Sequence, residues 1–261
     1  MRRDTAFMFD VDGVLADTPQ EAAWYLAAEA RGMASSREEF ARFYAAHVSG
    51  QPGLLGARVM LEGLRFPDGR TYVERCGIVD ELDLCKEAMA FRTEKQHCLQ
   101  ALLQAGPLRE YADTIGIAIE ARRRGHPVMA VSSSESAQAV LERLASSNNE
   151  LKGVFDTTAL GTITHWHGAN IAKEHHYAMA YGKLIQKSGY IPRPIVFDDA
   201  PTGMAAIKRL GFTGVGIARN VAGWATKDDL LRAGATIALD ETDLAQGYDG
   251  IEVMLAPFVT Q

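Results

Sequence analysis

The sequence predicts an α/β protein in which a parallel sheet is covered by helices on both faces and a small helical domain is inserted near the N-terminus. Two observations predict it. Apolar runs of strand length alternate with amphipathic helical patterns over most of the chain, whereas residues 36–104 carry several helical patterns and almost no strand pattern. The 261 residues suffice for one large domain with a smaller appendage, and a hydrophobic content of 47% supports a well-buried core.

The first predicted strand begins at Ala6 and runs into Asp10-Val11-Asp12-Gly13. Its apolar residues suit a strand buried on both faces, so we expect it to be the central strand of the sheet. Asp10 and Asp12 point to the same side at strand periodicity, and Gly13 allows a sharp turn. Two carboxylates about 4 Å apart repel each other by several kcal/mol in a partly buried site. The pair therefore indicates a bound cation, a catalytic task, or both.

Helical patterns follow the first strand. We expect a helix over 19–31, with Thr18 as its N-cap and Glu21 as the capping-box partner. The inserted helical region then has amphipathic segments at 38–47, 54–64 and 83–103.

The alternating pattern resumes near residue 107. The expected strands are 128–131, 195–197, 214–217 and a weak 236–239. The expected helices are 111–124, 136–145, 174–188, 204–210 and 227–233. Residues 156–173 have little periodicity and are expected to form a loop or an irregular extension.

Three predicted strands end in polar residues: Asp10 with Asp12, then Ser132, then Asp198-Asp199. Because the carboxyl ends of parallel strands lie on one edge of a sheet, these four carboxylates converge. They need a hard divalent cation, and an all-oxygen site with few protein ligands suits Mg²⁺. Mg²⁺ favours a phosphate substrate, whose oxygens the Ser132 hydroxyl and the N–H groups that begin the next helix can hold.

The residues 10–14, the strand that ends in Ser132, and the residues 198–203 resemble motifs I, II and IV of the haloacid dehalogenase (HAD) superfamily, in order and in approximate separation. The helical insertion is similar to the small cap of that family's first cap class, C1. The resemblance covers essentially the whole chain, which is similar to the β-phosphoglucomutase and phosphatase branch. It implies a Rossmann-like core formed by 1–15 and 107–261, with a helical cap domain at 16–106.

The resemblance also implies roles for the acidic residues. Asp10 would be the nucleophile that forms an aspartyl-phosphate, and Asp12 would protonate the leaving alkoxide and later accept a proton from water. Mg²⁺ would be held by Asp10, the backbone carbonyl of Asp12, Asp198 and Asp199.

Phosphate binding is assigned to Ser132, Ser133 and a lysine. Lys173 comes closest to the position where the family places that lysine, although the prolines typical of the segment are missing. In the cap, Lys95 lies in a segment similar to those with which relatives reach their substrate.

These features predict a phosphatase acting on a small phosphorylated metabolite, a sugar phosphate or a related monoester. A β-phosphoglucomutase-like mutase is the alternative, and Glu135 disfavours it because such mutases tend to carry a basic residue there for a second phosphate. Dehalogenases of the family lack the carboxylate that Asp12 supplies. A phosphonate hydrolase would need a cap lysine that forms a Schiff base, a role open to Lys95. A catalytically silent binding protein is the non-enzymatic alternative.

Composition excludes several other classes. The net charge of -6 and the absence of a basic run longer than 122–124 predict no nucleic-acid or membrane partner. We recognise no signal peptide or transmembrane stretch, and three cysteines without metal-type spacing indicate free thiols, so we expect a cytoplasmic location. His165, His167, His175 and His176 lie close in sequence without a nearby cysteine, and we expect no zinc there. The oligomeric state stays open.

Overall fold

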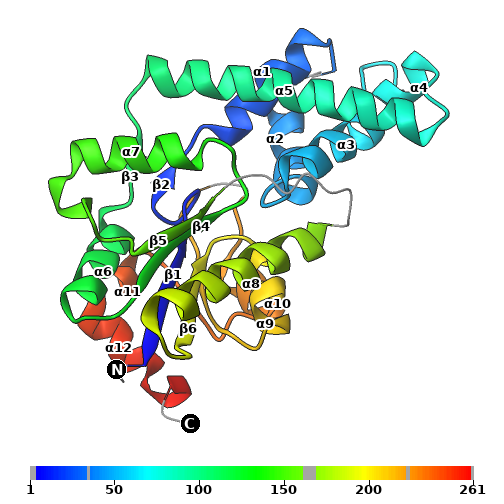
Figure 1. Cartoon of the computed structure of the whole chain (residues 1–261). Coiled ribbons are helices and arrows are strands. Elements are labelled where there is room, and N and C mark those ends of the chain that lie inside the picture. Colours follow the sequence, from blue (N-terminus) through cyan, green and yellow to red (C-terminus); the bar gives the residue numbers. More distant parts are fainter. Residues whose placement is uncertain (1–3, 34–35, 161–168, 222–223, 260–261) are drawn as a thin grey trace. The chain divides into compact units, whose positions relative to one another are not determined.

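The fold is built on a six-stranded parallel sheet. The computed structural model describes residues 4–33, 36–160, 169–221 and 224–259 (Figure 1). The strand order is β5-β4-β1-β6-β7-β8, so the first strand is central, as the sequence predicts. The strands are β1 (Thr5–Asp10), β4 (Val128–Ser132), β5 (Thr157–Leu160), β6 (Arg193–Asp198), β7 (Thr213–Ile217) and β8 (Ile237–Leu239). Two short strands, β2 (Ala16–Asp17) and β3 (Arg109–Glu110), pair antiparallel in a separate sheet.

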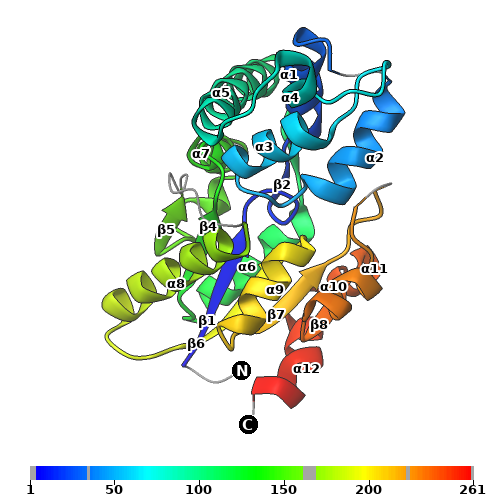
Figure 2. The same ribbon diagram turned by 90° about the vertical axis from the view of Figure 1, so that its right-hand side faces the viewer.

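Helices cover both faces of the parallel sheet. One face carries α6 (Ala112–Arg123), α11 (Glu241–Leu244) and α12 (Gly247–Val259), and the other carries α8 (Ala169–Ser188), α9 (Pro201–Arg209) and α10 (Lys227–Ala233) (Figure 1). Figure 2 shows α8, α9 and α10 in front of the strands. The helix α7 (Ala137–Ser147) and the short 3₁₀ helix η1 (Asn149–Leu151) connect β4 to β5. The α/β prediction is therefore confirmed.

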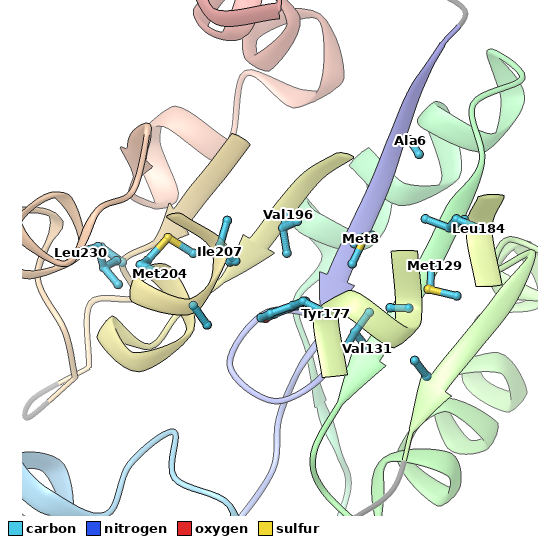
Figure 3. Close-up of a cluster of buried hydrophobic side chains, with 14 residues drawn as sticks. Ala6, Met8, Met129, Val131, Tyr177, Leu184, Val196, Met204, Ile207 and Leu230 are labelled. Carbon is cyan, nitrogen blue, oxygen red and sulfur yellow. The ribbon is translucent and has the colours of Figure 1, made fainter. Parts of the chain in front are cut away.

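The two faces of β1 bury different side chains because a strand alternates its residues. Phe7 and Phe9 share one face, where Phe9 stacks on Phe197 with ring centroids 4.6 Å apart. Ala6 and Met8 face the other way. They belong to a buried cluster in which strand residues meet Tyr177 and Leu184 of α8 (Figure 3). Asp10 is two positions after Met8, so it points toward the same face, which α8 covers.

The chain divides into two compact units. One comprises Met1–Thr18, Leu108–Thr162 and Asn170–Gln261, and the other is built on Pro19–Pro107. The second unit is helical and has a core of its own, in which Trp24 packs edge-on against Phe91. Its helices are α1 (Gln20–Ala30), α2 (Arg37–His47), α3 (Gly53–Gly63), α4 (Tyr72–Cys76) and α5 (Glu81–Ala105). The reading of this unit as a substrate-facing cap stays a prediction.

Two local predictions are wrong. Residues 156–173 are not simply a loop, because β5 pairs with β4 along the edge of the sheet and α8 begins at Ala169. A four-residue edge strand is too short to show a period and pairs on one side only. Thr18 is not the N-cap of α1, since Pro19 holds that position without a side-chain cap. Thr18 instead hydrogen-bonds Asp12.

No helix within the described ranges is both long enough and apolar enough to cross a membrane. Cys76, Cys85 and Cys98 are free thiols, as predicted.

Candidate active site

The acidic cluster lies at the carboxyl ends of adjacent strands. Asp10 ends β1 and Asp198 ends β6, and these two strands pair in register from Thr5 with Arg193 to Phe9 with Phe197. Asp10 follows Met8 by two residues, and Asp198 follows Val196 by two. Both carboxylates therefore point toward the face that α8 covers. Both are buried, at 5% and 0% exposure.

Lys173 of α8 lies between these two carboxylates. Its Nζ is 2.8 Å from Asp10 Oδ2 and 3.1 Å from Asp198 Oδ2. Burial alone would lower the pKa of Lys173, but the two carboxylates outweigh burial and raise the pKa above its usual value. The lysine therefore keeps its charge inside the cluster. Among the lysines near this position, the structure brings Lys173 to the predicted site.

Asp198 has donors on both of its oxygens. The backbone N–H of Ala200 donates to Oδ1 at 2.8 Å, and the Tyr177 hydroxyl donates to Oδ2, which Lys173 also contacts. Tyr177 is buried, and burial together with the neighbouring Asp198 raises its pKa, so the phenol keeps its proton. Sequence reasoning missed this residue. Its signal is the four-residue spacing from Lys173, which places both side chains on one side of a helix.

Asp199 lies against the turn that follows β1. A Cβ on Gly13 would lie 2.1 Å from Asp199 Oδ2, and a Cβ on Gly203 would lie 1.9 Å from Asp198 Oδ2. Gly13 also has φ of +77°, in the left-handed region that favours glycine. Burial, followed by the charges of Asp198, Asp10 and Asp12, raises the pKa of Asp199 well above its usual value. The carboxylates repel one another, and Lys173 offsets only part of that repulsion.

The three clustered carboxylates fit a hard cation. One carboxylate oxygen from each of Asp10, Asp198 and Asp199 lies within 4.8 Å of the others, and in the described part of the chain this is the one such group of potential metal ligands. All three donors are oxygens, which Mg²⁺ prefers. Burial raises the pKa of Asp10 to about 6 and Asp198 adds to the effect, against the opposing influence of Lys173. A bound cation would relieve this repulsion.

Asp12 is not one of the three residues whose carboxylate oxygens lie within 4.8 Å of one another, although its charge acts on Asp199. Its Oδ1 accepts hydrogen bonds from the Thr18 backbone N–H, at 3.2 Å, and from the Thr18 hydroxyl. The side chain is thus oriented by the residue that the sequence assigns to a helix cap. The predicted contribution of Asp12 to a metal site is its backbone carbonyl, and that contribution stays a prediction.

The predicted phosphate-binding serines follow β4. Val131 pairs with Asp10, so Ser132 lies one residue further along the neighbouring strand, at the same edge of the sheet. Ser132 is buried, and its Oγ accepts a hydrogen bond from the backbone N–H of Ser134 at 3.1 Å. Ser133 is partly exposed in the same turn. Their roles toward phosphate stay predictions.

Lys95 belongs to the second unit. It is 7% exposed, and its Nζ contacts the Gln20 side chain and lies 5.3 Å from the Trp24 ring. Its proposed contact with substrate stays a prediction. His165 and His167 of the histidine-rich segment lie outside the described residues, whereas His175 is exposed and His176 is buried.

Comparison with solved structures identifies the fold. A β-phosphoglucomutase from the archaeon Pyrococcus sp. strain ST 04 superposes with a TM-score of 0.64 at 23% identity, over 88% of this chain and 98% of that chain. A predicted phosphoglycolate phosphatase from Haemophilus somnus 129pt gives 0.66 at 13% identity, over 97% and 99%. The chain has the haloacid dehalogenase fold. The motif resemblance implied this fold, and the structure confirms it.

A third similar structure carries a ligand. CbbY from Rhodobacter sphaeroides, in a mutant form bound to xylulose-1,5-bisphosphate, superposes with a TM-score of 0.63 at 19% identity, over 90% of this chain and 92% of that chain.

No protein-family model matches the sequence, and no curated protein sequence matches it.

Replacing Tyr177 tests its support of Asp198. Tyr177→Phe removes the hydroxyl donor and keeps the buried ring, so we expect Mg²⁺ or Mn²⁺ to bind about tenfold more weakly, as is usual when a group that orients a metal ligand is lost. Titration calorimetry measures the affinity. The matched control is Tyr181→Phe, which removes a hydroxyl from the same helix, where it donates to the Pro192 carbonyl at 2.9 Å. Equal affinities for both variants would contradict this support.

The raised pKa of Asp10 predicts pH-dependent metal binding. Below about pH 6 the carboxyl group is protonated in the metal-free protein, and a cation must displace that proton. Affinity should therefore fall about tenfold for each pH unit below about 6, and the raised pKa of Asp199 acts in the same direction. Calorimetric titrations with Mn²⁺ at pH 5 and pH 7.5 measure the difference, and equal affinities at the two values would contradict the prediction.

Proposed function

We propose that the chain is a Mg²⁺-dependent phosphatase of the haloacid dehalogenase type that cleaves a small phosphorylated metabolite, a sugar phosphate or a related monoester. One observation carries the proposal. A strand-end carboxylate, Asp10, shares a cluster with a buried lysine and with two further carboxylates that fit a divalent cation. The similar structures support the substrate class, because their names refer to phosphoglucose, phosphoglycolate and xylulose bisphosphate.

Two contacts fix the Asp10 carboxylate in one orientation, which attack on a substrate requires. Its Oδ1 accepts the backbone N–H of Val11 at 2.9 Å, and its Oδ2 contacts Lys173. Attack of the carboxylate on phosphorus forms an acyl phosphate on Asp10 while the bond from phosphorus to the ester oxygen breaks. One difficult displacement thereby becomes two easier ones.

Asp12 serves both steps as the proton carrier. It gives its proton to the leaving oxygen in the first step and takes a proton from the attacking water in the second, which releases phosphate and restores Asp10. Thr18 holds the Asp12 side chain through two hydrogen bonds to Oδ1. Such orientation matters because proton transfer needs hydrogen-bond distance.

The cation would be held by Asp10, Asp198, Asp199 and the backbone carbonyl of Asp12. Bound there, Mg²⁺ would screen the repulsion between the attacking carboxylate and the phosphate. Lys173 would contact phosphoryl oxygens from the side of α8.

Ser132 and Ser133 would bind the remaining phosphoryl oxygens. Both precede α7, and hydroxyl and N–H groups at such a position suit an anion. In the second unit, Lys95 is the residue that we propose for contact with the rest of the substrate.

Asparagine at position 10 tests the nucleophile. Asp10→Asn keeps the shape of the side chain and removes its charge, so Mg²⁺-dependent phosphate release should fall at least about a thousandfold. The measurement is a phosphate-release screen over a panel of sugar phosphates and simpler monoesters, with and without EDTA. Asp249→Asn, an exposed carboxylate on α12, is the control and should retain activity. Wild-type activity in Asp10→Asn would contradict the assignment, and a wild-type protein inactive on every ester would favour a silent binding protein.

A phosphomutase is the second candidate, and the β-phosphoglucomutase among the similar structures favours it. Against it stands Glu135, an exposed acid in the turn after β4, which would repel a second phosphate.

A bisphosphate activator separates the two reactions. We expect a hexose 1-phosphate to release phosphate at the same rate with or without catalytic hexose 1,6-bisphosphate, because water accepts the phosphoryl group in a phosphatase. Phosphate assay and nuclear magnetic resonance of the sugar follow the two products. Isomerisation to the 6-phosphate that depends on the bisphosphate would establish the mutase instead.

A further inference from the structure

Arg219 is a buried cation outside the acidic cluster. It lies in the loop after β7, and its side chain is 1% exposed. The guanidinium pairs with Asp113 in the first turn of α6 through two contacts, Nη1 to Oδ2 at 2.7 Å and Nη2 to Oδ1 at 3.0 Å. Its flat face lies on the Tyr111 ring, with Cζ 3.8 Å from the centroid. A planar, two-pronged group fits this setting, and a lysine ammonium does not.

The same guanidinium reaches the turn that follows the nucleophile strand. Its Nε donates to the Gly13 carbonyl at 3.4 Å and its Nη2 donates to the Val14 carbonyl at 3.3 Å. The Thr114 hydroxyl also donates to the Val14 carbonyl. Two backbone carbonyls directly after Asp12 are thereby tied to both α6 and the loop after β7.

This turn positions the groups that the proposed reaction uses. Gly13 has φ of +77° and lies against Asp199, so a shift of its backbone moves the Asp12 side chain and crowds a carboxylate of the cluster. Thr18 orients Asp12 from the other end through its side-chain contacts. Arg219 therefore holds the backbone of the turn, and Thr18 holds the Asp12 carboxylate.

We propose that Arg219 is a positioning residue that holds the Asp12-Gly13 turn, so that Asp12 stays in place to pass its proton to the leaving oxygen. This inference rests on the proposed function. In the first step the bond from Asp10 to phosphorus forms, the ester bond breaks, and the departing oxygen takes the Asp12 proton. Asp113 and the Tyr111 ring fix the guanidinium that holds the turn.

Two kinds of ester separate positioning from a general loss of structure. An aryl phosphate with an acidic leaving group departs without much help from a proton, whereas an alkyl phosphate needs it. A loosened Asp12 should therefore slow alkyl esters more than aryl esters. A variant that only destabilises the fold should slow both equally.

The experiment compares Arg219→Met, Arg219→Lys and Arg124→Met with the wild-type full-length protein. Arg124 is the control position, at the C-terminal end of α6. It pairs with Glu120 of that helix and with Asp249 of α12. For p-nitrophenyl phosphate and an alkyl phosphate, we expect kcat/KM of Arg219→Met to fall about tenfold more for the alkyl ester, within the range that acid–base catalysis supplies. The ratio of the two kcat/KM values for Arg219→Lys should lie between those of the wild type and Arg219→Met. Arg124→Met should leave this ratio unchanged.

Hydrogen exchange tests the turn independently of activity. Amides of residues 11–16 should exchange faster in Arg219→Met and not in Arg124→Met, while those of β4 should be unchanged in both. If Arg219→Met does not fold, Arg219→Lys carries the same comparison.

An unchanged ester ratio with unchanged exchange at 11–16 would overturn the inference. A wild-type protein that cleaves neither ester would instead overturn the proposed function. Hydrogen exchange would then decide by itself whether Arg219 holds the turn.

Discussion

The rest of the structure depends on a buried ammonium between two carboxylates. Lys173 is 5% exposed, and it contacts Asp10 and Asp198, which are also buried. Removing one partner of a buried ion pair typically costs about 3–5 kcal/mol, because the charge left behind has no compensation. The contacts form only when β1 and β6 are neighbours and α8 covers their shared face. The candidate site thus requires this strand order and the position of α8.

Packing around the acidic cluster restricts which residues can occupy the neighbouring positions. The positions of Gly13 and Gly203 leave no room for a Cβ, since each would overlap a carboxylate. Glycine is required at both positions because of close approach, and at Gly13 also because of a positive φ. The site therefore brings acidic groups closer together than their charges favour, with Lys173 as partial compensation. A divalent cation is the natural complement to such an arrangement.

The proposed chemistry divides between rigid and adjustable parts. Asp10, Asp198 and Lys173 are on strands and a helix of the core, where packing holds them. Asp12 is on a turn and depends on contacts from Thr18 and, through the backbone, from Arg219. Attack on phosphorus needs the rigid part, and proton transfer needs the turn. Both phosphatases and mutases can be built on such a core, so the fold does not by itself choose between them.

The sequence by itself determined the α/β class, the central strand and the acidic residues of the cluster. Apolar runs, helical periods and strand-end carboxylates are local patterns, and the parallel sheet brings strand ends together by rule. It also indicated Lys173, through the motif resemblance rather than through any local property.

Only the tertiary structure decided which side chains meet across long stretches of chain. Lys173 and Asp10 are 163 residues apart, and Arg219 and Gly13 are 206 apart. Thr18 looked like a helix cap because its local sequence fits one, yet its hydroxyl binds Asp12. The edge strand β5 was missed because its four residues become a strand only by pairing with β4. These features depend on contacts between distant segments, which no local pattern encodes.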